Sequence, residues 1–311
     1  MKKVLISAPY MVRERERVSS LLAGKPVRVE WAEVEERLEE DDLVNILGEY
    51  HGIICGDDRI TARVLDAAPM LEVIVKWGTG VDSIDQEEAG RRKIPVRRTP
   101  NAFSEPVADT ALALMLAFGR SIFASDRIMK QGGWDKPQGF CLSEKTVGII
   151  GLGDSGTAVA RRLASFGARV IANDTAQKDP ELVESLKVRM VDKEELYRLA
   201  DIITLHCDLN PTSFRLLDRA AFAKMTRRPY LINVARGQLI EERALEEALT
   251  EGKIAGAGLD VYEEEPLAKD SPLRRMDNVI LSSHNANSSR LYWQRVHENS
   301  VRMLMEGLGI D

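Results

Sequence analysis

A glycine-rich turn, Gly151-Leu152-Gly153-Asp154-Ser155-Gly156, follows the apolar run 146–150 and opens an apolar-periodic stretch typical of a helix. In a dinucleotide-binding turn the first glycine allows the sharp bend, the second lets the backbone approach a pyrophosphate, and the third lets helix and strand pack closely. The N-terminus of the helix then offers N–H groups and a positive dipole end to the phosphates. The turn therefore predicts a parallel α/β sheet that binds a dinucleotide.

A second strand-like run, 169–173, ends in the carboxylate of Asp174 at the spacing that this motif requires. A carboxylate there accepts hydrogen bonds from the adenosine ribose hydroxyls and repels a 2′-phosphate, which favours NAD over NADP. The cofactor contacts predicted from this unit are Gly151, Gly153, Asp154, Ser155, Gly156 and Asp174. The alternative is a structural glycine turn followed by an acidic loop.

The composition is that of an ordinary globular enzyme, with 44% hydrophobic and 30% charged residues among 311. This length favours two domains. The net charge of −6 and the lack of a Lys/Arg block argue against nucleic acid as a partner, and no apolar run is long enough to span a membrane. We expect a cytoplasmic protein. Cys55, Cys141 and Cys207 show neither disulfide nor zinc spacing, so no metal site is predicted.

Alternating strand and helix signals divide the chain into two doubly wound parallel-sheet domains of the α/β class. About five strands in residues 1–98 indicate a flavodoxin-like substrate domain, to which a C-terminal helix within 288–311 could return. Residues 99–287 hold six strand-like runs, which match a Rossmann NAD domain. Ser104 and Pro106 suggest the start of a helix. The segment 121–144 is predicted to be irregular and, in an oligomer, a contact arm.

Three ionisable residues follow the fourth, fifth and sixth strands of the second domain, where open parallel sheets bind their ligands. Arg236 can hold a carboxylate through two parallel N–H contacts, His284 can exchange a proton near neutral pH, and Glu265 can orient that imidazole. Together with a nicotinamide they predict a dehydrogenase of 2-hydroxy or 2-oxo acids. Alternatively, Arg236 forms a surface ion pair, Glu265 lies in a solvated acidic loop, and His284 is structural.

His206 and Cys207 follow the third strand of the same domain. At that place in the sheet, contact with the adenine side of the cofactor is plausible, but no chemistry is implied.

At this point the chain resembles the D-isomer-specific 2-hydroxyacid dehydrogenase family over nearly all of its length. The matching motifs occur in family order: 76–85 resembles the substrate loop, 106–109 the connecting helix, and 232–237, 258–261, 265–266 and 284–285 the catalytic loops. The resemblance implies the roles given above for Arg236, Glu265 and His284. It also implies a homodimer formed through the nucleotide domain, and a substrate bound in the cleft between the domains.

The resemblance assigns further contacts. It implies that Asp260 lies near the nicotinamide carboxamide and that the backbone around Thr79 and Gly80 meets the substrate carboxylate. Residues assigned to binding on the same ground are Lys76 for the substrate, and Val107, Val234 and Ala235 for the cofactor.

Within the family the resemblance is strongest to the phosphoglycerate dehydrogenase branch, which predicts NAD-dependent oxidation of a D-3-phosphoglycerate-like acid. One departure concerns the loop 55–59, where that branch usually carries arginine and this chain has Asp57 and Asp58. Acidic groups near a phosphate are unfavourable. The alternatives are therefore a reductase of glyoxylate, hydroxypyruvate or another small 2-oxo acid, a phosphonate-oxidising relative, and an NAD-sensing protein that resembles the family's corepressors.

Overall fold

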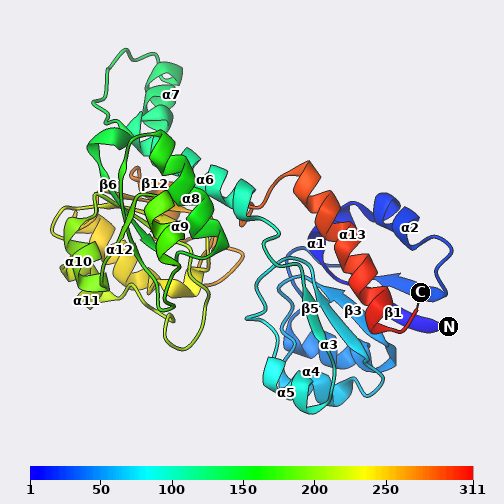
Figure 1. Cartoon of the computed structure of the whole chain (residues 1–311). Helices are drawn as coiled ribbons and strands as arrows, with labels where there is room; N and C mark the ends of the chain where they lie inside the picture. The colour runs from blue at the N-terminus through cyan, green and yellow to red at the C-terminus, as the bar shows by residue number, and fades with distance from the viewer. Residues whose placement is uncertain (311) are drawn as a thin grey trace. The chain divides into compact units, whose positions relative to one another are not determined.

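The computed structural model describes residues 1–310, which fold into two compact units, and each unit is described by itself (Figure 1). Unit 1 comprises residues 1–103 and the C-terminal segment from Ser289, and unit 2 comprises Ser104–Ser288. The boundaries drawn from the sequence, 98/99 and 287/288, differ slightly. Residues 99–103 belong to unit 1 because Thr99 N–H donates to the Gly78 carbonyl and Phe103 packs against Trp77.

Unit 1 contains a five-stranded parallel sheet in the order β2-β1-β3-β4-β5, which is the flavodoxin-like order. Its strands are β1 (Lys2–Ile6), β2 (Val27–Trp31), β3 (Gly52–Cys55), β4 (Val73–Lys76) and β5 (Val96–Arg98). Its helices are α1 (Pro9–Arg13), α2 (Arg15–Leu22), α3 (Glu40–Ile46), η1 (Leu47–Glu49), α4 (Ala62–Ala67), α5 (Gln86–Arg91) and α13 (Arg290–Gly307). The last helix, α13, packs on β3, β4 and α2, so the C-terminal segment completes this unit.

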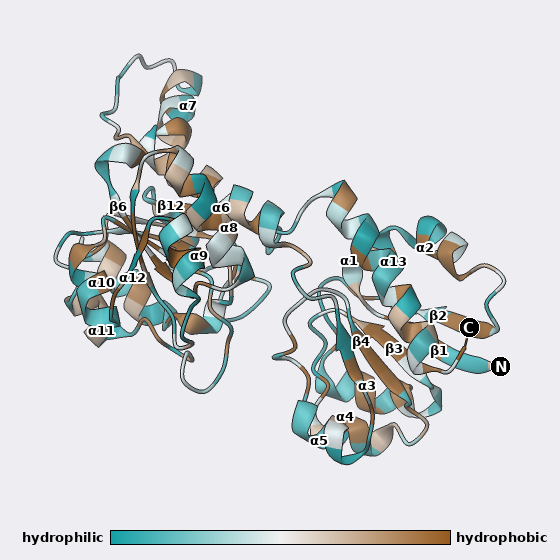
Figure 2. Cartoon of the chain, in the orientation of Figure 1, coloured by the Kyte–Doolittle hydropathy of each residue, from teal (hydrophilic) through white to brown (hydrophobic). Residues whose placement is uncertain are grey.

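The central strands of unit 1 are continuous apolar runs because helices cover both faces of a parallel sheet. Every residue of β3 and β4 is buried. Figure 2 shows these strands as hydrophobic, with hydrophilic residues on the surrounding helices. Two side chains cap the N-termini of helices in this unit. Thr61 accepts a hydrogen bond from Val64 N–H in α4, and Asp85 accepts one from Glu88 N–H in α5.

Unit 2 contains a seven-stranded parallel sheet in the order β12-β11-β10-β9-β6-β7-β8, which extends the six-stranded Rossmann order by one strand. Its strands are β6 (Thr146–Ile150), β7 (Arg169–Asn173), β8 (Val188–Met190), β9 (Ile202–Leu205), β10 (Tyr230–Asn233), β11 (Gly256–Leu259) and β12 (Val279–Leu281). Its helices are α6 (Ser104–Gly119), α7 (Ile122–Lys130), η2 (Leu142–Glu144), α8 (Asp154–Ser165), α9 (Pro180–Ser185), α10 (Lys193–Leu199), α11 (Arg219–Ala223), η3 (Gly237–Leu239), α12 (Glu242–Thr250) and η4 (Pro272–Arg275).

Two sequence-based expectations for unit 2 were wrong. The prediction of six strands missed β8, a three-residue edge strand with two exposed residues, which leaves almost no apolar pattern to detect. The prediction of an irregular segment at 121–144 missed α7, because the glycines and the proline that suggested irregular chain all lie after Lys130. Figure 1 shows α7 and the loop after it projecting from the rest of unit 2.

The connecting helix α6 begins at Ser104 and is half buried in the core of unit 2. Within residues 1–310 no single helix is long and apolar enough to cross a membrane, and only the bent pair α6–α7 meets the length and composition of a span.

Candidate functional site

The glycine turn connects β6 to α8, and the three glycines have different surroundings. A Cβ on Gly151 would lie 2.5 Å from Cys207 N, and a Cβ on Gly156 would lie 2.0 Å from the Gly151 carbonyl oxygen. Both positions therefore require glycine, and Gly151 also has a left-handed φ of 93°. A Cβ on Gly153 would meet nothing within 4 Å. This is the open space that a pyrophosphate needs in order to approach the turn and the N-terminus of α8, where Asp154 and Ser155 stand.

Asp174 follows β7 and holds the glycine turn from its side. Its Oδ2 accepts a hydrogen bond from Leu152 N–H at 2.7 Å, its Oδ1 accepts one from Ala176 N–H at 2.8 Å, and the Lys178 ammonium lies 2.9 Å from Oδ2. Burial raises the pKa of Asp174, but these three donors outweigh it and the net pKa is lowered. A hollow of about 610 Å³ opens beside this carboxylate. The group is therefore charged, with a cation beside it, and its contact with a ribose stays a prediction.

His206 and Cys207 follow β9 and pack against the glycine turn. His206 Nε2 lies 2.8 Å from Thr204 Oγ1, whereas its buried Nδ1 has no partner within residues 1–310. Burial lowers the pKa of His206 to about 3 and raises the pKa of Cys207 to about 11, so both side chains are neutral at physiological pH. An orphaned nitrogen at this edge fits a bound dinucleotide.

Arg236 stands on a turn after β10 that is built by Asn233. The fully buried Asn233 amide donates from Nδ2 to the Arg236 carbonyl at 2.9 Å and accepts Ala235 N–H on Oδ1 at 3.1 Å. The next residue must be small, because a Cβ on Gly237 would lie 1.8 Å from the Tyr262 carbonyl group. These contacts fix the backbone that carries the guanidinium. Sequence reasoning missed Asn233, although an amide inside the apolar run Ile232-Asn233-Val234 is a signal for a buried hydrogen-bonding role.

Asp260 follows β11 and holds the loop that carries His284. Its buried carboxylate accepts Asn285 N–H at 2.9 Å and Ala286 N–H at 2.8 Å, and its own carbonyl accepts His284 N–H at 2.7 Å. These bonds stabilise His284 in a left-handed conformation with φ of 49°, which is unfavourable for a side chain of this size. Whether Asp260 also meets the nicotinamide carboxamide stays a prediction.

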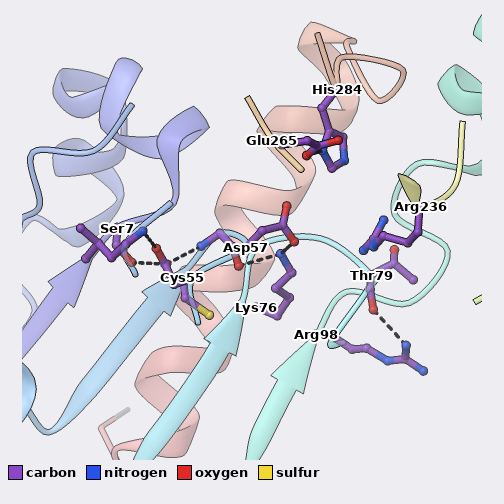
Figure 3. Close-up of polar contacts among 12 residues, drawn as sticks. Ser7, Cys55, Asp57, Lys76, Thr79, Arg98, Arg236, Glu265 and His284 are labelled. Carbon is purple, nitrogen blue, oxygen red and sulfur yellow. Dashed lines mark hydrogen bonds and ion pairs between the residues drawn. The ribbon is translucent and has the colours of Figure 1, made fainter. Parts of the chain in front are cut away.

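His284 and Glu265 form a hydrogen-bonded pair. The imidazole Nδ1 lies 2.7 Å from Glu265 Oε2, and Glu265 Oε1 accepts Tyr262 N–H at 3.0 Å, which fixes the carboxylate (Figure 3). A carboxylate on Nδ1 keeps the proton there in the neutral ring and stabilises the imidazolium when the ring is charged. The pair can therefore deliver a proton from Nε2 to an oxygen and recover it. Both side chains are partly exposed, at 21% and 15%.

Arg236, Glu265 and His284 follow β10, β11 and β12, which are neighbours in the sheet. Because these strands are parallel, their carboxyl ends lie at one edge, where the sequence placed the three residues. The remaining predicted cofactor contacts also belong to unit 2: Val107 lies in the first turns of α6, and Val234 and Ala235 directly follow β10.

The charged residues at the carboxyl edge of unit 1 are engaged with each other. The buried ammonium of Lys76 donates to Asp57 Oδ1 and to the Gly56 carbonyl, both at 2.7 Å (Figure 3). Asp58 is fully buried and accepts hydrogen bonds from Ser7 Oγ and Leu38 N–H at 2.6 Å and from Gly56 N–H at 3.0 Å. The expectation that two aspartates face the substrate was therefore wrong for Asp58, which is used to fold the loop.

The predicted substrate loop of unit 1 rests on an aromatic cluster. Trp77 stacks on Tyr10 with ring centroids 4.4 Å apart, and its Nε1–H donates to His297 Nδ1 at 2.8 Å. Thr79 and Gly80 lie just beyond, and Arg98 at the end of β5 donates to the Thr79 carbonyl at 2.9 Å. Arg98 is exposed and has no carboxylate partner within the described residues. Sequence reasoning did not single it out.

Comparisons with known proteins agree with this geometry. Residues 112–286 match the family model described as "D-isomer specific 2-hydroxyacid dehydrogenase, NAD binding domain". The chain is 38% identical over 273 residues to a glyoxylate reductase of Thermofilum pendens, covering 85% of this chain and 80% of that protein. It is 41% identical over 258 residues to a D-3-phosphoglycerate dehydrogenase of Methanocaldococcus jannaschii, covering 82% of this chain and 48% of that protein. The solved TT0316 protein of Thermus thermophilus is 33% identical, with a TM-score of 0.83 over 99% of this chain and 98% of that one.

Proposed function

The chain belongs to the D-isomer specific 2-hydroxyacid dehydrogenase family, and we propose that within this family it reduces a small 2-oxo acid without a phosphate, such as glyoxylate or hydroxypyruvate. As an NAD-dependent enzyme of this family it interconverts 2-hydroxy and 2-oxo acids. Which acid it uses is the proposal. Its similarity to a glyoxylate reductase across most of both chains supports this choice.

The observation that carries the proposal is the charge balance of the loop after β3. Lys76, the buried cation of this edge, is neutralised by Asp57, so only one of its three N–H donors is left. Asp58 lies close by, where burial raises the pKa of its carboxyl, and it adds no positive charge. Arg59, the other cation of this loop, lies 3.9 Å from Glu39. A phosphate dianion brought to this loop would therefore find both cations already paired with carboxylates, and it would lose hydration with little compensation. A short, uncharged substrate tail avoids this cost.

The residues of unit 2 supply the chemistry. Arg236 binds the substrate carboxylate through two N–H donors and polarises the 2-oxo group. His284 donates its proton to the carbonyl oxygen as that oxygen gains charge, and Glu265 stabilises the imidazolium beforehand. Bound NADH supplies the hydride that the carbonyl carbon receives. In the opposite direction His284 acts as the base that removes the hydroxyl proton.

A second candidate is the oxidation of a D-3-phosphoglycerate-like acid, which the sequence favoured. One observation supports it: Arg98 is an exposed arginine held against the Thr79 carbonyl, in the predicted substrate loop. A guanidinium at that place could bind a phosphate through two N–H donors.

The test follows NADH oxidation by the purified protein with glyoxylate, hydroxypyruvate, 3-phosphohydroxypyruvate, pyruvate and 2-oxoglutarate. We expect the highest kcat/KM with glyoxylate or hydroxypyruvate, and no loss of it in Arg98→Met. A higher kcat/KM with the phosphorylated acid that disappears selectively in Arg98→Met would overturn the proposal in favour of the second candidate. If none of the five acids supported NADH oxidation, both candidate functions would be contradicted.

We also propose that the protein is a homodimer that uses α7 and the loop after it. No residue of α7 is buried, even though the helix carries three large apolar side chains. Ile122, Phe123 and Met129 are each more than half exposed, and Trp134 in the following loop is 76% exposed. Apolar groups gathered on one projecting segment indicate an interface. Light scattering at micromolar concentration should give a dimer, and Phe123→Asp/Trp134→Asp should give a monomer. Phe214→Asp, at an exposed phenylalanine elsewhere in unit 2, is the control. A wild-type monomer would defeat this part of the proposal.

A further inference from the structure

A second hollow lies at the amino-terminal edge of the sheet of unit 2. It has a volume of about 620 Å³, which falls within the roughly 300–1,000 Å³ of small-molecule sites. Thr146 and Arg169, the first residues of β6 and β7, line it together with Lys187, which directly precedes β8. Because all these strands are parallel, this edge is opposite to the one that carries the glycine turn and Asp174. The hollow is therefore separate from the cofactor-binding edge.

The lining of this hollow is strongly cationic. Four of its residues are basic, namely Arg169, Lys187, Arg189 and Arg227, and none is acidic. Arg189 pairs with Glu195 at 2.9 Å, and Arg227 pairs with Asp201 at 3.4 Å.

The other two cations have no such partner. Arg169 donates from Nε to Thr146 Oγ1 at 3.2 Å, and within residues 1–310 neither Arg169 nor Lys187 has a carboxylate within ion-pair distance. Two positive charges thus line a concave surface without counter-charges. Both side chains are exposed, and an anion bound in the hollow would supply the counter-charge that they lack.

Lys187 reaches the wall of the hollow from the end of a helix. Lys187 follows the C-terminus of α9 with a left-handed φ of 53°, at a position where glycine is the most favourable residue. Lys93, Arg215 and Arg228 share this conformation, so the backbone only explains how the Lys187 side chain comes to line the hollow. The wall also includes apolar surface from Val170 and Leu199, so a bound molecule would be partly desolvated, and its contacts with the cations would be strengthened.

We propose that this hollow is a binding site for a compact polyanion, a small molecule with two or more phosphate or carboxylate groups, distinct from NAD and from the 2-oxo acid. Arg169 and Lys187 make the decisive contacts. Arg189 and Arg227 are each paired with a carboxylate and add little net charge to the site. The strands that start at the hollow, β6 and β7, end at Gly151 and Asp174, so the ligand would sit at the far ends of the two strands that hold the cofactor-binding groups.

The experiment is calorimetric titration of the full-length protein with pyrophosphate and, separately, with citrate, at low ionic strength and with saturating NADH present. We expect one site per chain for at least one of the two probes, with little change in affinity when NADH is omitted. The double variant Arg169→Glu/Lys187→Glu should weaken binding by about tenfold or more, because each lost charged contact is worth at least that factor. The two probes distinguish a phosphate ligand from a polycarboxylate.

The matched control is Lys269→Glu/Arg275→Glu, which changes the charge equally at two exposed cations of unit 2 outside the hollow. It should bind the probe with wild-type affinity. Equal weakening in both double variants would show only a general charge effect and would overturn the proposal. Displacement of the probe by NADH, or no binding of either probe, would overturn it as well. Circular dichroism of both variants checks that they are folded.

Discussion

The carboxyl edges of the two sheets are both rich in charged residues, but they use them differently. In unit 1 the charged side chains are bonded into the loop itself: Lys76 to Asp57 and Gly56, and Asp58 to three donors around it. In unit 2 the loops that carry Arg236 and His284 are instead held by the buried side chains of Asn233 and Asp260.

This difference indicates that the charged residues of unit 1 mainly stabilise the fold, whereas those of unit 2 serve the reaction. Asn233 and Asp260 satisfy backbone groups beneath Arg236 and His284, so buried neighbours fix the backbone that carries those two side chains. In unit 1 the charges are part of the fold, and the substrate would meet mainly backbone groups and neutral pairs. Substitutions at the edge of unit 2 should therefore reduce turnover, and those at the edge of unit 1 should reduce stability.

The largest effect is expected for His284→Gln. The amide can still bond Glu265 but cannot exchange a proton, so kcat should fall by roughly 10²-fold to 10⁴-fold, the usual contribution of a general acid or base. The affinity for NADH, measured by fluorescence titration, should stay unchanged. Turnover at the wild-type level would remove His284 from the mechanism and with it the contrast between the two edges.

Arg236→Lys should have the next largest effect. Lysine keeps the charge but loses the planar pair of donors, so kcat/KM for the 2-oxo acid should fall by roughly tenfold to a hundredfold. Steady-state kinetics with the best substrate measure this. The conservative change keeps the bond from Asn233 to the Arg236 carbonyl, although it removes the bond from the Arg236 guanidinium to the Ala235 carbonyl. A kcat/KM near that of the wild type would contradict carboxylate binding by Arg236.

Asp58→Ala tests the expectation that a substitution at the edge of unit 1 reduces stability rather than turnover. It leaves Ser7 Oγ, Leu38 N–H and Gly56 N–H without their acceptor, and a buried unsatisfied donor costs about 1–3 kcal/mol. Because three donors are affected, the free energy of unfolding in urea should fall by at least that amount, whereas kcat per folded molecule should change little. A large loss of kcat at unchanged stability would show that this edge takes part in chemistry.

Much of the fold could be predicted from the sequence because buried parallel strands are continuous apolar runs. The runs at β3, β4 and β6 have this form, and the order of strands and helices follows from them. The placement of Arg236, Glu265 and His284 was predictable for a related reason: residues after parallel strands meet at one edge whatever their separation in sequence.

The contacts that could not be predicted depend on the register of the strands and on how deeply each side chain is buried. The pairing of Lys76 with Asp57 requires that Cys55 stands opposite Lys76 in the β3–β4 ladder, and no local pattern specifies that register. Nor does the sequence show that Asp58 points inward while its neighbour Asp57 stays partly exposed. These contacts decide the charge of the substrate edge, so the fold was easier to predict than the substrate.

Acid should weaken both units, each through one histidine whose pKa is lowered by burial. Burial lowers the pKa of His297 in unit 1 to about 4 and of His206 in unit 2 to about 3, below the value of about 6.5 for an unfolded histidine. Between these values the unfolded chain binds more protons, so stability is lost as pH falls below about 6.5, by up to about 1.4 kcal/mol per pH unit for each histidine. Urea unfolding at pH 7, 6 and 5 should show this slope. His297→Gln should flatten it for unit 1 alone, and an unaltered slope would mean that other groups control acid sensitivity.

The smallest effect concerns the preference between NAD and NADP. Asp174 repels a 2′-phosphate, but Lys178 at 2.9 Å offsets part of that repulsion. Asp174→Ala frees the ammonium, so kcat/KM with NADPH should rise relative to NADH by about tenfold, the value of one charged contact. It also removes the acceptor of Leu152 N–H and should therefore weaken both cofactors somewhat. The matched variant Asp174→Ala/Lys178→Met should lose the gain with NADPH but keep the weakening. If both variants show the same ratio, Lys178 does not meet the phosphate, and the charge pair beside the cofactor is purely structural, like the pair of Lys76 and Asp57 in unit 1.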